Sequence, residues 1–209
     1  MTDKDEVEDD EEEIKVILVG EMGTGKTSLI NTAIGLQFQE KLASTTTNSI
    51  MNKTMKINGK NYSINLWDTI GQEKYRSLTK IFMKGSKVVI FVYDITNKES
   101  FKELNYWFES TKDIINEQTV MGIVGNKSDL FLKEEVSENE ARQLAKEKGY
   151  EFALTSAKNS AMFCEFLEKL IKKYLGEEID DDDEEDNTKK KTEKLKVGDT
   201  KTKGKRNCC

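Results

Sequence analysis

The sequence of 209 residues contains no histidine and no proline, and only three cysteines. Without histidine, neither a Ser-His-Asp or Cys-His catalytic site nor a histidine-ligated zinc site can form. Without proline, PxxP-type ligand segments are excluded. Cys164, Cys208 and Cys209 are too few and too badly spaced for a disulfide framework or a four-thiolate zinc site. We therefore expect a protein of a reducing compartment.

Long apolar runs are also missing. No uninterrupted apolar run of about 18 residues occurs, so the sequence predicts no membrane-spanning helix. The N-terminus is acidic where a signal peptide would be basic and then apolar. We accordingly expect a protein that is neither secreted nor membrane-spanning.

Charge divides the chain into segments. The formal net charge of −6 combines −8 over residues 1–13, +4 over 14–176, −9 over 177–188 and +7 over 189–206. Runs of like charge with few apolar residues cannot bury enough surface to offset chain entropy. We therefore predict an acidic disordered N-terminus, one folded domain over 14–176, and a disordered tail over 177–209 that is acidic, then basic, and ends in Cys-Cys. The mildly positive core has no basic, aromatic-rich face, so we expect no nucleic-acid partner.

Within the core, short apolar runs alternate with amphipathic stretches, which is typical of an α/β fold with a mostly parallel sheet. The predicted strands are 14–19, 50–57, 62–67, 88–93, 120–124 and 151–155. The predicted helices are 27–34, 98–116, 137–148 and 160–174, the third opening on a capping box of Ser137 and Glu140. Asn58-Gly59-Lys60 predicts a tight turn between the second and third strands. The expected architecture is a mostly parallel six-stranded sheet with one antiparallel edge hairpin and helices on both faces.

The first chemical motif is a phosphate-binding loop. Residues 20–27 read Gly-Glu-Met-Gly-Thr-Gly-Lys-Thr, which matches G-x-x-x-x-G-K-[ST] between a predicted strand and a predicted helix. The backbone N–H groups of such a loop curl around an anion, and the helix N-terminus adds partial positive charge. Lys26 can reach the terminal phosphates, and Thr27 can offer its hydroxyl to Mg²⁺. The competing interpretation is a glycine-rich turn with an ordinary capping threonine. The residues assigned to nucleotide binding here are Glu21, Met22, Gly23, Thr24, Gly25, Lys26, Thr27 and Ser28.

A second motif concerns the base. Asn126-Lys127-Ser128-Asp129 follows directly after a predicted strand. The carboxylate of Asp129 can accept hydrogen bonds from the ring N–H and the exocyclic amine of guanine, both of which adenine lacks. Such a site can reject the wrong base by about four orders of magnitude. The tetrapeptide alone would be an ordinary surface loop, but the carboxyl end of a strand is where such sheets bind ligands. We assign Asn126, Lys127 and Asp129 to guanine binding.

Four motifs in one chain now support a named resemblance. They are, in order, residues 20–27, 68–72 (Asp-Thr-Ile-Gly-Gln), 126–129 and 155–158 (Thr-Ser-Ala-Lys), and together they resemble the small GTPases of the Ras superfamily. Residues 67–69, 74–79, 91–96 and the terminal Cys-Cys resemble the Rab branch in particular. The resemblance covers 14–176 and implies the P-loop small GTPase fold. It also implies a switch that cycles between GTP and GDP, binds the nucleotide with Mg²⁺, hydrolyses GTP slowly and regulates vesicle trafficking.

The resemblance assigns further roles by position. Asp68 would hold Mg²⁺ through water, the N–H of Gly71 would contact the γ-phosphate, and Gln72 would orient the attacking water. Gln72 and Lys26 are therefore the predicted catalytic residues. Thr45 suits the switch threonine that binds Mg²⁺ when the γ-phosphate is present, so Thr27, Thr45 and Asp68 form the predicted metal set. Without the resemblance, Thr45 reads as a loop hydroxyl and Gln72 as a solvated side chain.

The rim of the guanine pocket is assigned in the same way. Phe38 falls where the family packs an aromatic ring against the base, although a core position is the alternative. Ser156 and Ala157 would close the pocket, and Lys158 would steady it.

Partners follow from the same resemblance. No residue is an evident built-in arginine finger, so a GTPase-activating protein is implied, and tight nucleotide binding implies an exchange factor as well. Cys208 and Cys209 resemble a doubly geranylgeranylated terminus, and two lipid chains give stable anchoring where one is marginal. The basic block upstream would add attraction to anionic lipid. We expect effectors, prenylation and membrane-extraction chaperones, a monomer, and a location on the cytosolic face of an intracellular membrane with cycling through the cytosol.

Three departures from the family pattern leave other functions open. Ile70 stands where the family has alanine, and Met22 stands where relatives have a small residue. Residues 45–50 replace a more apolar switch sequence, which predicts little exposed hydrophobic surface for effectors. We hypothesise intact nucleotide binding, slow hydrolysis and an unusual choice of effector. The alternatives are a GTP-binding scaffold with little or no hydrolysis and, with less support, a P-loop ATPase or nucleotide kinase.

Overall fold

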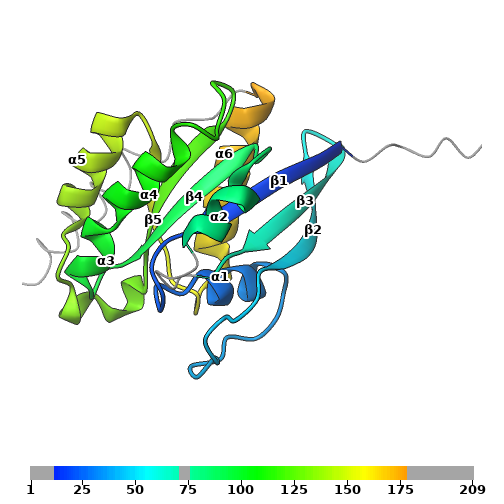
Figure 1. Ribbon diagram of the computed structural model, residues 1–209. Helices are drawn as coiled ribbons and strands as arrows, with labels where there is room; N and C mark the ends of the chain where they lie inside the picture. Colours follow the sequence, from blue (N-terminus) through cyan, green and yellow to red (C-terminus); the bar gives the residue numbers. More distant parts are fainter. Residues whose placement is uncertain (1–11, 71–75, 178–209) are drawn as a thin grey trace, which may run out of the picture. The chain divides into compact units, whose positions relative to one another are not determined.

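The computed structural model describes residues 12–70 and 76–177. Their centre is a six-stranded sheet in the order β2-β3-β1-β4-β5-β6, parallel except for the β2–β3 pair (Figure 1). The strands are β1 (Glu12–Val19), β2 (Ser49–Ile57), β3 (Lys60–Asp68), β4 (Val88–Asp94), β5 (Val120–Asn126) and β6 (Glu151–Leu154). The predicted mixed α/β sheet with an edge hairpin is confirmed.

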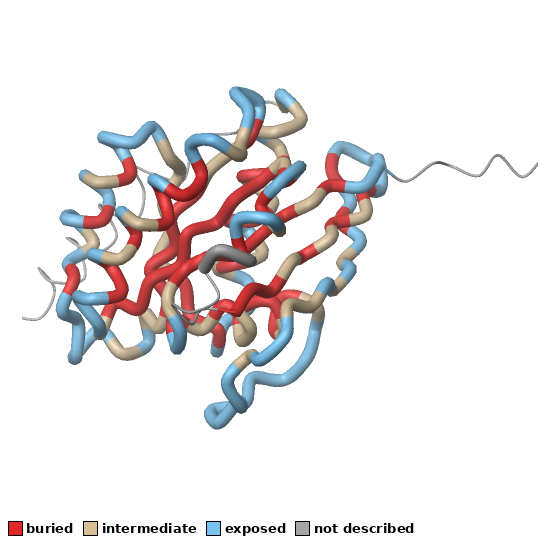
Figure 2. The backbone as a smooth tube through the Cα atoms, viewed as in Figure 1, coloured by how far each residue is buried: buried red, intermediate tan, exposed pale blue. Residues whose placement is uncertain are grey.

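Burial follows the position of each strand in the sheet. Every residue of the central strand β4 is buried, as expected for a parallel strand covered on both faces (Figure 2). The edge strand β2 instead alternates between exposed and partly buried residues over most of its length. Its turn to β3 has positive φ at both Asn58 (48°) and Gly59 (86°), the conformation that the sequence predicts there.

Helices cover both faces of the sheet. One apolar cluster joins it to α1 (Lys26–Ala33) and α6 (Ser160–Leu175). The other joins it to α2 (Arg76–Met83), α3 (Lys98–Lys102), α4 (Leu104–Thr111) and α5 (Glu138–Lys148). At the start of α5, the hydroxyl oxygen of Ser137 accepts a hydrogen bond from the N–H of Glu140, so this predicted cap is confirmed. Within 12–70 and 76–177, no helix is long and apolar enough to cross a bilayer.

Several boundaries differ from the prediction. The expected helix 98–116 is two helices, which meet at Glu103, where ψ opens to −12°, and the second ends at Thr111. Neither α2 nor the 3₁₀ helix over Ser128–Lys133 was predicted. Strand β1 begins two residues before the expected Ile14. Of the segments predicted to be disordered, Glu12 and Glu13 belong instead to β1, and residues 1–11 and 178–209 lie outside the described residues, so for them the prediction stays a prediction.

Candidate functional site

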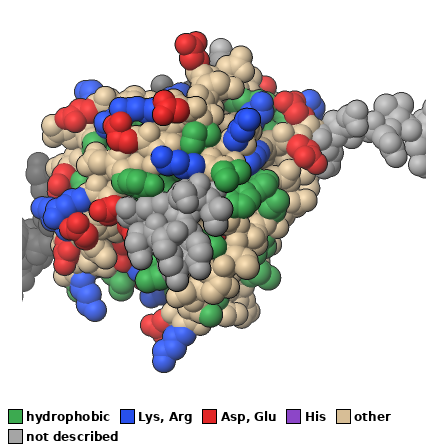
Figure 3. All heavy atoms as spheres, viewed as in Figure 1, with side chains coloured by type: hydrophobic (Ala, Val, Ile, Leu, Met, Phe, Trp, Pro, Cys, Tyr) green, Lys and Arg blue, Asp and Glu red, His purple; other side chains and the backbone are tan. Residues whose placement is uncertain are grey.

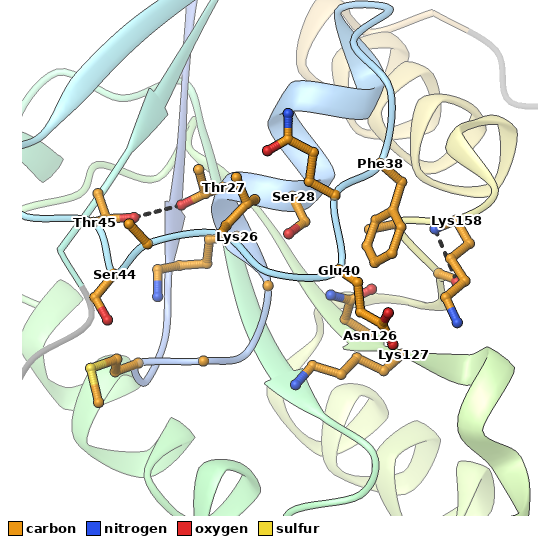
Figure 4. A pocket seen from close by; sticks show the side chains of 18 of the residues that line it. Lys26, Thr27, Ser28, Phe38, Glu40, Ser44, Thr45, Asn126, Lys127 and Lys158 are labelled. Atoms are coloured by element: carbon orange, nitrogen blue, oxygen red, sulfur yellow. Dashed lines mark hydrogen bonds between the residues drawn. The ribbon is translucent and has the colours of Figure 1, made fainter.

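The loops after β1, β3, β5 and β6, together with the loop between α1 and β2, line a pocket of about 490 Å³ whose lining includes both Lys26 and Asp129 (Figure 4). In Figure 4, Lys26, Thr27 and Thr45 lie at one end, with Phe38 and Lys158 at the other. The predicted site residues that line the pocket are Met22, Gly23, Gly25, Lys26, Thr27, Ser28, Phe38, Thr45, Asn126, Lys127, Asp129, Ser156, Ala157 and Lys158. Gly71, Gln72, Cys208 and Cys209 lie outside the described residues, so their roles stay predictions.

The glycines of the phosphate loop are required by close backbone approach. Gly20 has φ of +149°, and a Cβ there would lie 2.1 Å from the carbonyl oxygen of Val92. Gly25 has φ of +93°, and a Cβ there would lie 2.3 Å from the side-chain nitrogen of Asn126. The loop therefore fits against β4 and the last residue of β5 only when both positions lack a side chain.

Lys26 lies inside this loop. Its ammonium group donates hydrogen bonds to the carbonyl oxygens of Gly20 (2.8 Å) and Glu21 (2.9 Å), and the residue is 5% exposed. Burial lowers the pKa of Lys26 to about 8, against the opposing effect of Asp68 and Glu21. Lys26 is thus a buried cation fixed at the end of the pocket where α1 begins.

Three oxygen side chains gather beside Lys26. The hydroxyl of Thr27 donates to the carboxylate Oδ2 of Asp68 at 2.7 Å and lies 2.7 Å from the hydroxyl of Thr45. A hydroxyl carries one proton, so Thr45 must donate to Thr27. Burial raises the pKa of Asp68, and its other oxygen, Oδ1, is buried with no hydrogen-bond partner among the described residues. The cluster therefore holds one oxygen acceptor, Oδ1 of Asp68, that no described group occupies.

These oxygens fit magnesium. Mg²⁺ prefers oxygen ligands in an octahedron at 2.0–2.1 Å, which places neighbouring ligands about 3 Å apart. The 2.7 Å between the Thr27 and Thr45 hydroxyls is close to that spacing. Among the described residues no cluster of three or more Asp, Glu, Cys or His side chains could hold a metal by itself. A cation here would thus depend on phosphate oxygens and water for its remaining ligands.

The guanine motif is tied to the phosphate loop. The side-chain amide of Asn126 donates to the carbonyl oxygen of Thr24 at 2.8 Å, and the hydroxyl of Thr155 donates to the side-chain oxygen of Asn126 at 3.4 Å. Lys127 has a left-handed backbone, with φ of 65°, and its ammonium group pairs with Asp94 at 2.5 Å. The two ends of the pocket are therefore joined through Asn126.

Asp129 lies at the far end with two partners. The hydroxyl of Ser156 donates to Oδ1 at 2.6 Å, and the ammonium group of Lys158 contacts Oδ2 at 2.8 Å. Burial alone would raise the pKa of Asp129, but the hydrogen bonds from Lys158 and Ser156 outweigh it and lower the pKa. Lys158 also lies 5.8 Å from the ring centroid of Phe38, which is 38% exposed. The alternative of a core position for Phe38 is therefore wrong.

Some contacts were not predicted from the sequence. The hydroxyl of Thr69 donates to the carbonyl oxygen of Leu18, and the N–H of Ile70 donates to the side-chain oxygen of Asn48. Thr69 could have been noticed because it belongs to the 68–72 motif, whereas nothing in the sequence pattern marks Asn48. The pocket is also lined by Gln39, Glu40, Leu42, Ala43, Ser44 and Leu130, for which no motif gives a signal.

The residues that depart from the family pattern differ in how far they are exposed. Ile70 is 5% exposed, whereas Met22 is 57% exposed at the pocket. The expectation of little exposed hydrophobic surface is wrong at Ile50, which is 51% exposed and pairs with Trp67 across the β2–β3 ladder. On the face drawn in Figure 3, several hydrophobic side chains reach the surface.

Comparison with known proteins decides the family. A sequence model of the Ras family matches residues 15–176. The chain belongs to the Ras family. It is 32% identical over 94% of its length to the Ras-related protein SEC4 of Saccharomyces cerevisiae, covering 91% of that protein. It is 35% identical to the Ras-related protein Rab5A of Oryza sativa subsp. japonica, over 77% of this chain and 79% of that one. The Ras-related protein Rab-11C of Dictyostelium discoideum is 33% identical over 75% of this chain and 70% of its own.

This Ras-family chain is a small GTPase of the Rab type: it binds guanine nucleotide and hydrolyses GTP. Membership also implies regulators and effectors in general. The scaffold alternative is not favoured by these relatives. An ATPase or nucleotide kinase does not fit a family that binds guanine nucleotides.

Proposed function

We propose that the chain is a Rab-type switch of vesicle trafficking that holds GTP or GDP with Mg²⁺ in the pocket between Lys26 and Asp129. The observation that carries this proposal is that these two residues, far apart in the sequence, line one pocket. Its volume of about 490 Å³ lies in the range of small-molecule sites. The phosphates would lie at the Lys26 end and the base at the Asp129 end.

Recognition at the two ends uses different chemistry. At the phosphate end, the start of α1 and the buried ammonium group of Lys26 favour negative charge. At the base end, the Asp129 carboxylate would accept from the guanine N–H groups, and Phe38 would cover one face of the ring. Lys158 pairs with Asp129 at 2.8 Å and lies 5.8 Å from the centroid of the Phe38 ring, so it would hold this end in shape.

The metal belongs to the phosphate end. Thr27, Thr45 and Asp68 would hold Mg²⁺, the last through water that Oδ1, which no described residue contacts by a hydrogen bond, could orient. When bound, the cation would neutralise charge that develops on the phosphate oxygens. Thr45 lies on the long loop between α1 and β2, so its contact with Thr27 would draw that loop onto the nucleotide.

Hydrolysis in this arrangement depends on positioning and electrostatics rather than on a general-base histidine. Lys26 would stabilise charge on the transferred phosphoryl group, Gly71 would contact it through its N–H, and Gln72 would orient the attacking water. No arginine is among the described residues that line the pocket. An activating protein would therefore supply one, and an exchange factor would speed nucleotide release.

The tail would serve membrane attachment. Cys208 and Cys209 would each carry a lipid, with the basic residues of 189–206 adding attraction to an anionic surface. Prenylation and membrane-extraction chaperones would then move a monomeric protein between the cytosol and the cytosolic face of an intracellular membrane.

The proposal is tested by nucleotide identity and by competition. The purified protein should release GDP or GTP on denaturation, and GTP should displace a labelled GDP at concentrations where ATP does not. Asp129→Ala should weaken GDP binding at least about a hundredfold, because it removes both acceptors for the base. Asp113→Ala removes an exposed carboxylate away from the pocket and should leave binding unchanged. Equal displacement by ATP and GTP would overturn the assignment of Asp129.

A further inference from the structure

The loop before β2 and the segment after β3 are joined by one side chain. Oδ1 of Asn48 accepts a hydrogen bond from the N–H of Ile70 at 3.0 Å in a partly buried setting. The last pair of the β2–β3 ladder is Ser49 with Asp68. Asn48 and Ile70 therefore lie just beyond the end of the ladder, and the side-chain oxygen continues it where backbone pairing has stopped.

A second contact joins the same two segments a few residues away. The hydroxyl of Thr45 contacts Thr27, which in turn donates to Asp68. Together with Asn48 and Ile70, these contacts close a ring that runs through both segments and through the first residues of α1. Within this ring, Thr45 and Asp68 are proposed metal ligands, whereas Asn48 makes its contact outside the metal set.

Ile70 is well placed to transmit this contact. Its side chain is 5% exposed, and the preceding residue, Thr69, donates to the carbonyl oxygen of Leu18 at 2.7 Å. The N–H of Ile70 is thus held by Asn48, and the residue before it is held by β1. The next residue along the chain is Gly71, followed by Gln72, so the position of Ile70 sets the point from which both depart.

We propose that Asn48 is a positioning residue for GTP hydrolysis. It holds the N–H of Ile70, the residue that precedes Gly71 and Gln72 in the chain, and it makes the position of Ile70 depend on the loop that carries Thr45. The two segments then respond to the nucleotide as one unit. This inference rests on the proposed function, since it requires Gly71 and Gln72 to act at the γ-phosphate.

The test compares three substitutions. Asn48→Ala removes the acceptor, Asn48→Asp keeps an acceptor oxygen at the same reach, and Asn52→Ala makes the matched change at an exposed position of β2. Each protein is loaded with GTP, and the single-turnover hydrolysis rate is measured separately from the affinities for GDP and GTP. A thermal unfolding scan with GDP bound reports folding.

Asn48→Ala should slow hydrolysis about tenfold, because it removes the hydrogen bond to the N–H of Ile70 and a factor of ten is the size of effect expected for one such bond. The affinity for GDP should stay within about twofold, since GDP has no γ-phosphate for the segment to meet. Asn48→Asp should recover most of the rate, and Asn52→Ala should match the parent protein.

Three results would overturn the proposal. The first is a parental rate for Asn48→Ala. The second is a loss of GDP affinity as large as the loss of rate, which would show a merely structural role. The third is a rate for Asn48→Asp no better than that for Asn48→Ala. Gln72→Ala distinguishes a wrong role for Asn48 from a wrong proposed function. If Gln72→Ala hydrolyses GTP as fast as the parent, the role assigned to Gln72 is wrong. If Gln72→Ala is slow while Asn48→Ala is as fast as the parent, only the role assigned to Asn48 is wrong.

Discussion

Replacing Gly25 by alanine should disrupt the joint between the two ends of the pocket. The new Cβ would lie 2.3 Å from the side-chain nitrogen of Asn126, and φ at this position is +93°. A left-handed backbone costs alanine about 1–2 kcal/mol. The displaced Asn126 would also lose its 2.8 Å hydrogen bond to the carbonyl oxygen of Thr24, and a buried polar group left unpaired costs about 1–3 kcal/mol. The expected loss in the free energy of unfolding is about 3 kcal/mol.

Gly35→Ala is the matched control. Its φ of +94° is almost the same, but no atom of the described residues lies within 4 Å of the new Cβ. This variant should lose only the backbone cost of about 1–2 kcal/mol. The difference between the two variants therefore isolates the contact with Asn126.

The assay is denaturant unfolding with GDP present at a fixed concentration, together with the affinity for GDP. Gly25→Ala should bind GDP at least about tenfold more weakly. A tenfold loss corresponds to about 1.4 kcal/mol of binding free energy, which is less than the expected disruption around Asn126. Gly35→Ala should keep the parental affinity. If the two variants lost the same unfolding free energy and the same affinity, the reasoning about Asn126 as the joint would be refuted.

Four further predictions concern Ile70, Lys26 and the cysteines of the tail. Ile70→Ala should raise the single-turnover rate of GTP hydrolysis severalfold, because a β-branched side chain restricts the backbone before Gly71, and the loss of buried contacts should cost about 2–5 kcal/mol of stability. The control is Ile81→Ala, at a 69% exposed position. Equal rates for Ile70→Ala and the parent would show that Ile70 does not slow hydrolysis. Nucleotide affinity should fall as the pH rises above about 8, where Lys26 loses its proton, and a Lys26→Met variant should bind weakly without this dependence. The free energy of unfolding of the nucleotide-free protein should change in the opposite direction and rise between pH 8 and 10.5. Folding lowers the pKa of Lys26, so the unfolded chain binds more protons than the folded one across that window. Denaturant titrations at several pH values would measure this rise. Finally, a Cys208→Ser, Cys209→Ser double variant should fail to float with vesicles after enzymatic geranylgeranylation, whereas Cys164→Ser should float as the parent does.

Local patterns predict most of the sheet and both ends of the pocket. The strands are recognisable because their apolar runs are short and bounded, and the Asn-Gly turn marks the hairpin. The phosphate loop and the guanine motif can be predicted because each is a short run of characteristic residue types directly after a strand. The break at Glu103 has no such mark, since neither glycine nor proline interrupts the helical pattern there.

The remaining features depend on contacts between distant residues. Asn48 meets Ile70 only because the hairpin brings the ends of β2 and β3 together, and no local pattern records that meeting. The exposure of Ile50 likewise depends on which face of the edge strand meets the core. The prediction that Thr45 belongs to the metal set depended on the family resemblance, because its spacing from the phosphate loop carries no such meaning without it.

The position of β2 at the border of the sheet has a consequence for association between copies of the protein. A border strand offers unpaired backbone groups to any other strand of suitable length, which is a common origin of aggregation. Here the solvent side of β2 carries the exposed side chains of Thr54 and Lys56, and the opposite border, β6, is only four residues long. Charge at one border and shortness at the other therefore oppose growth of the sheet from one molecule into the next.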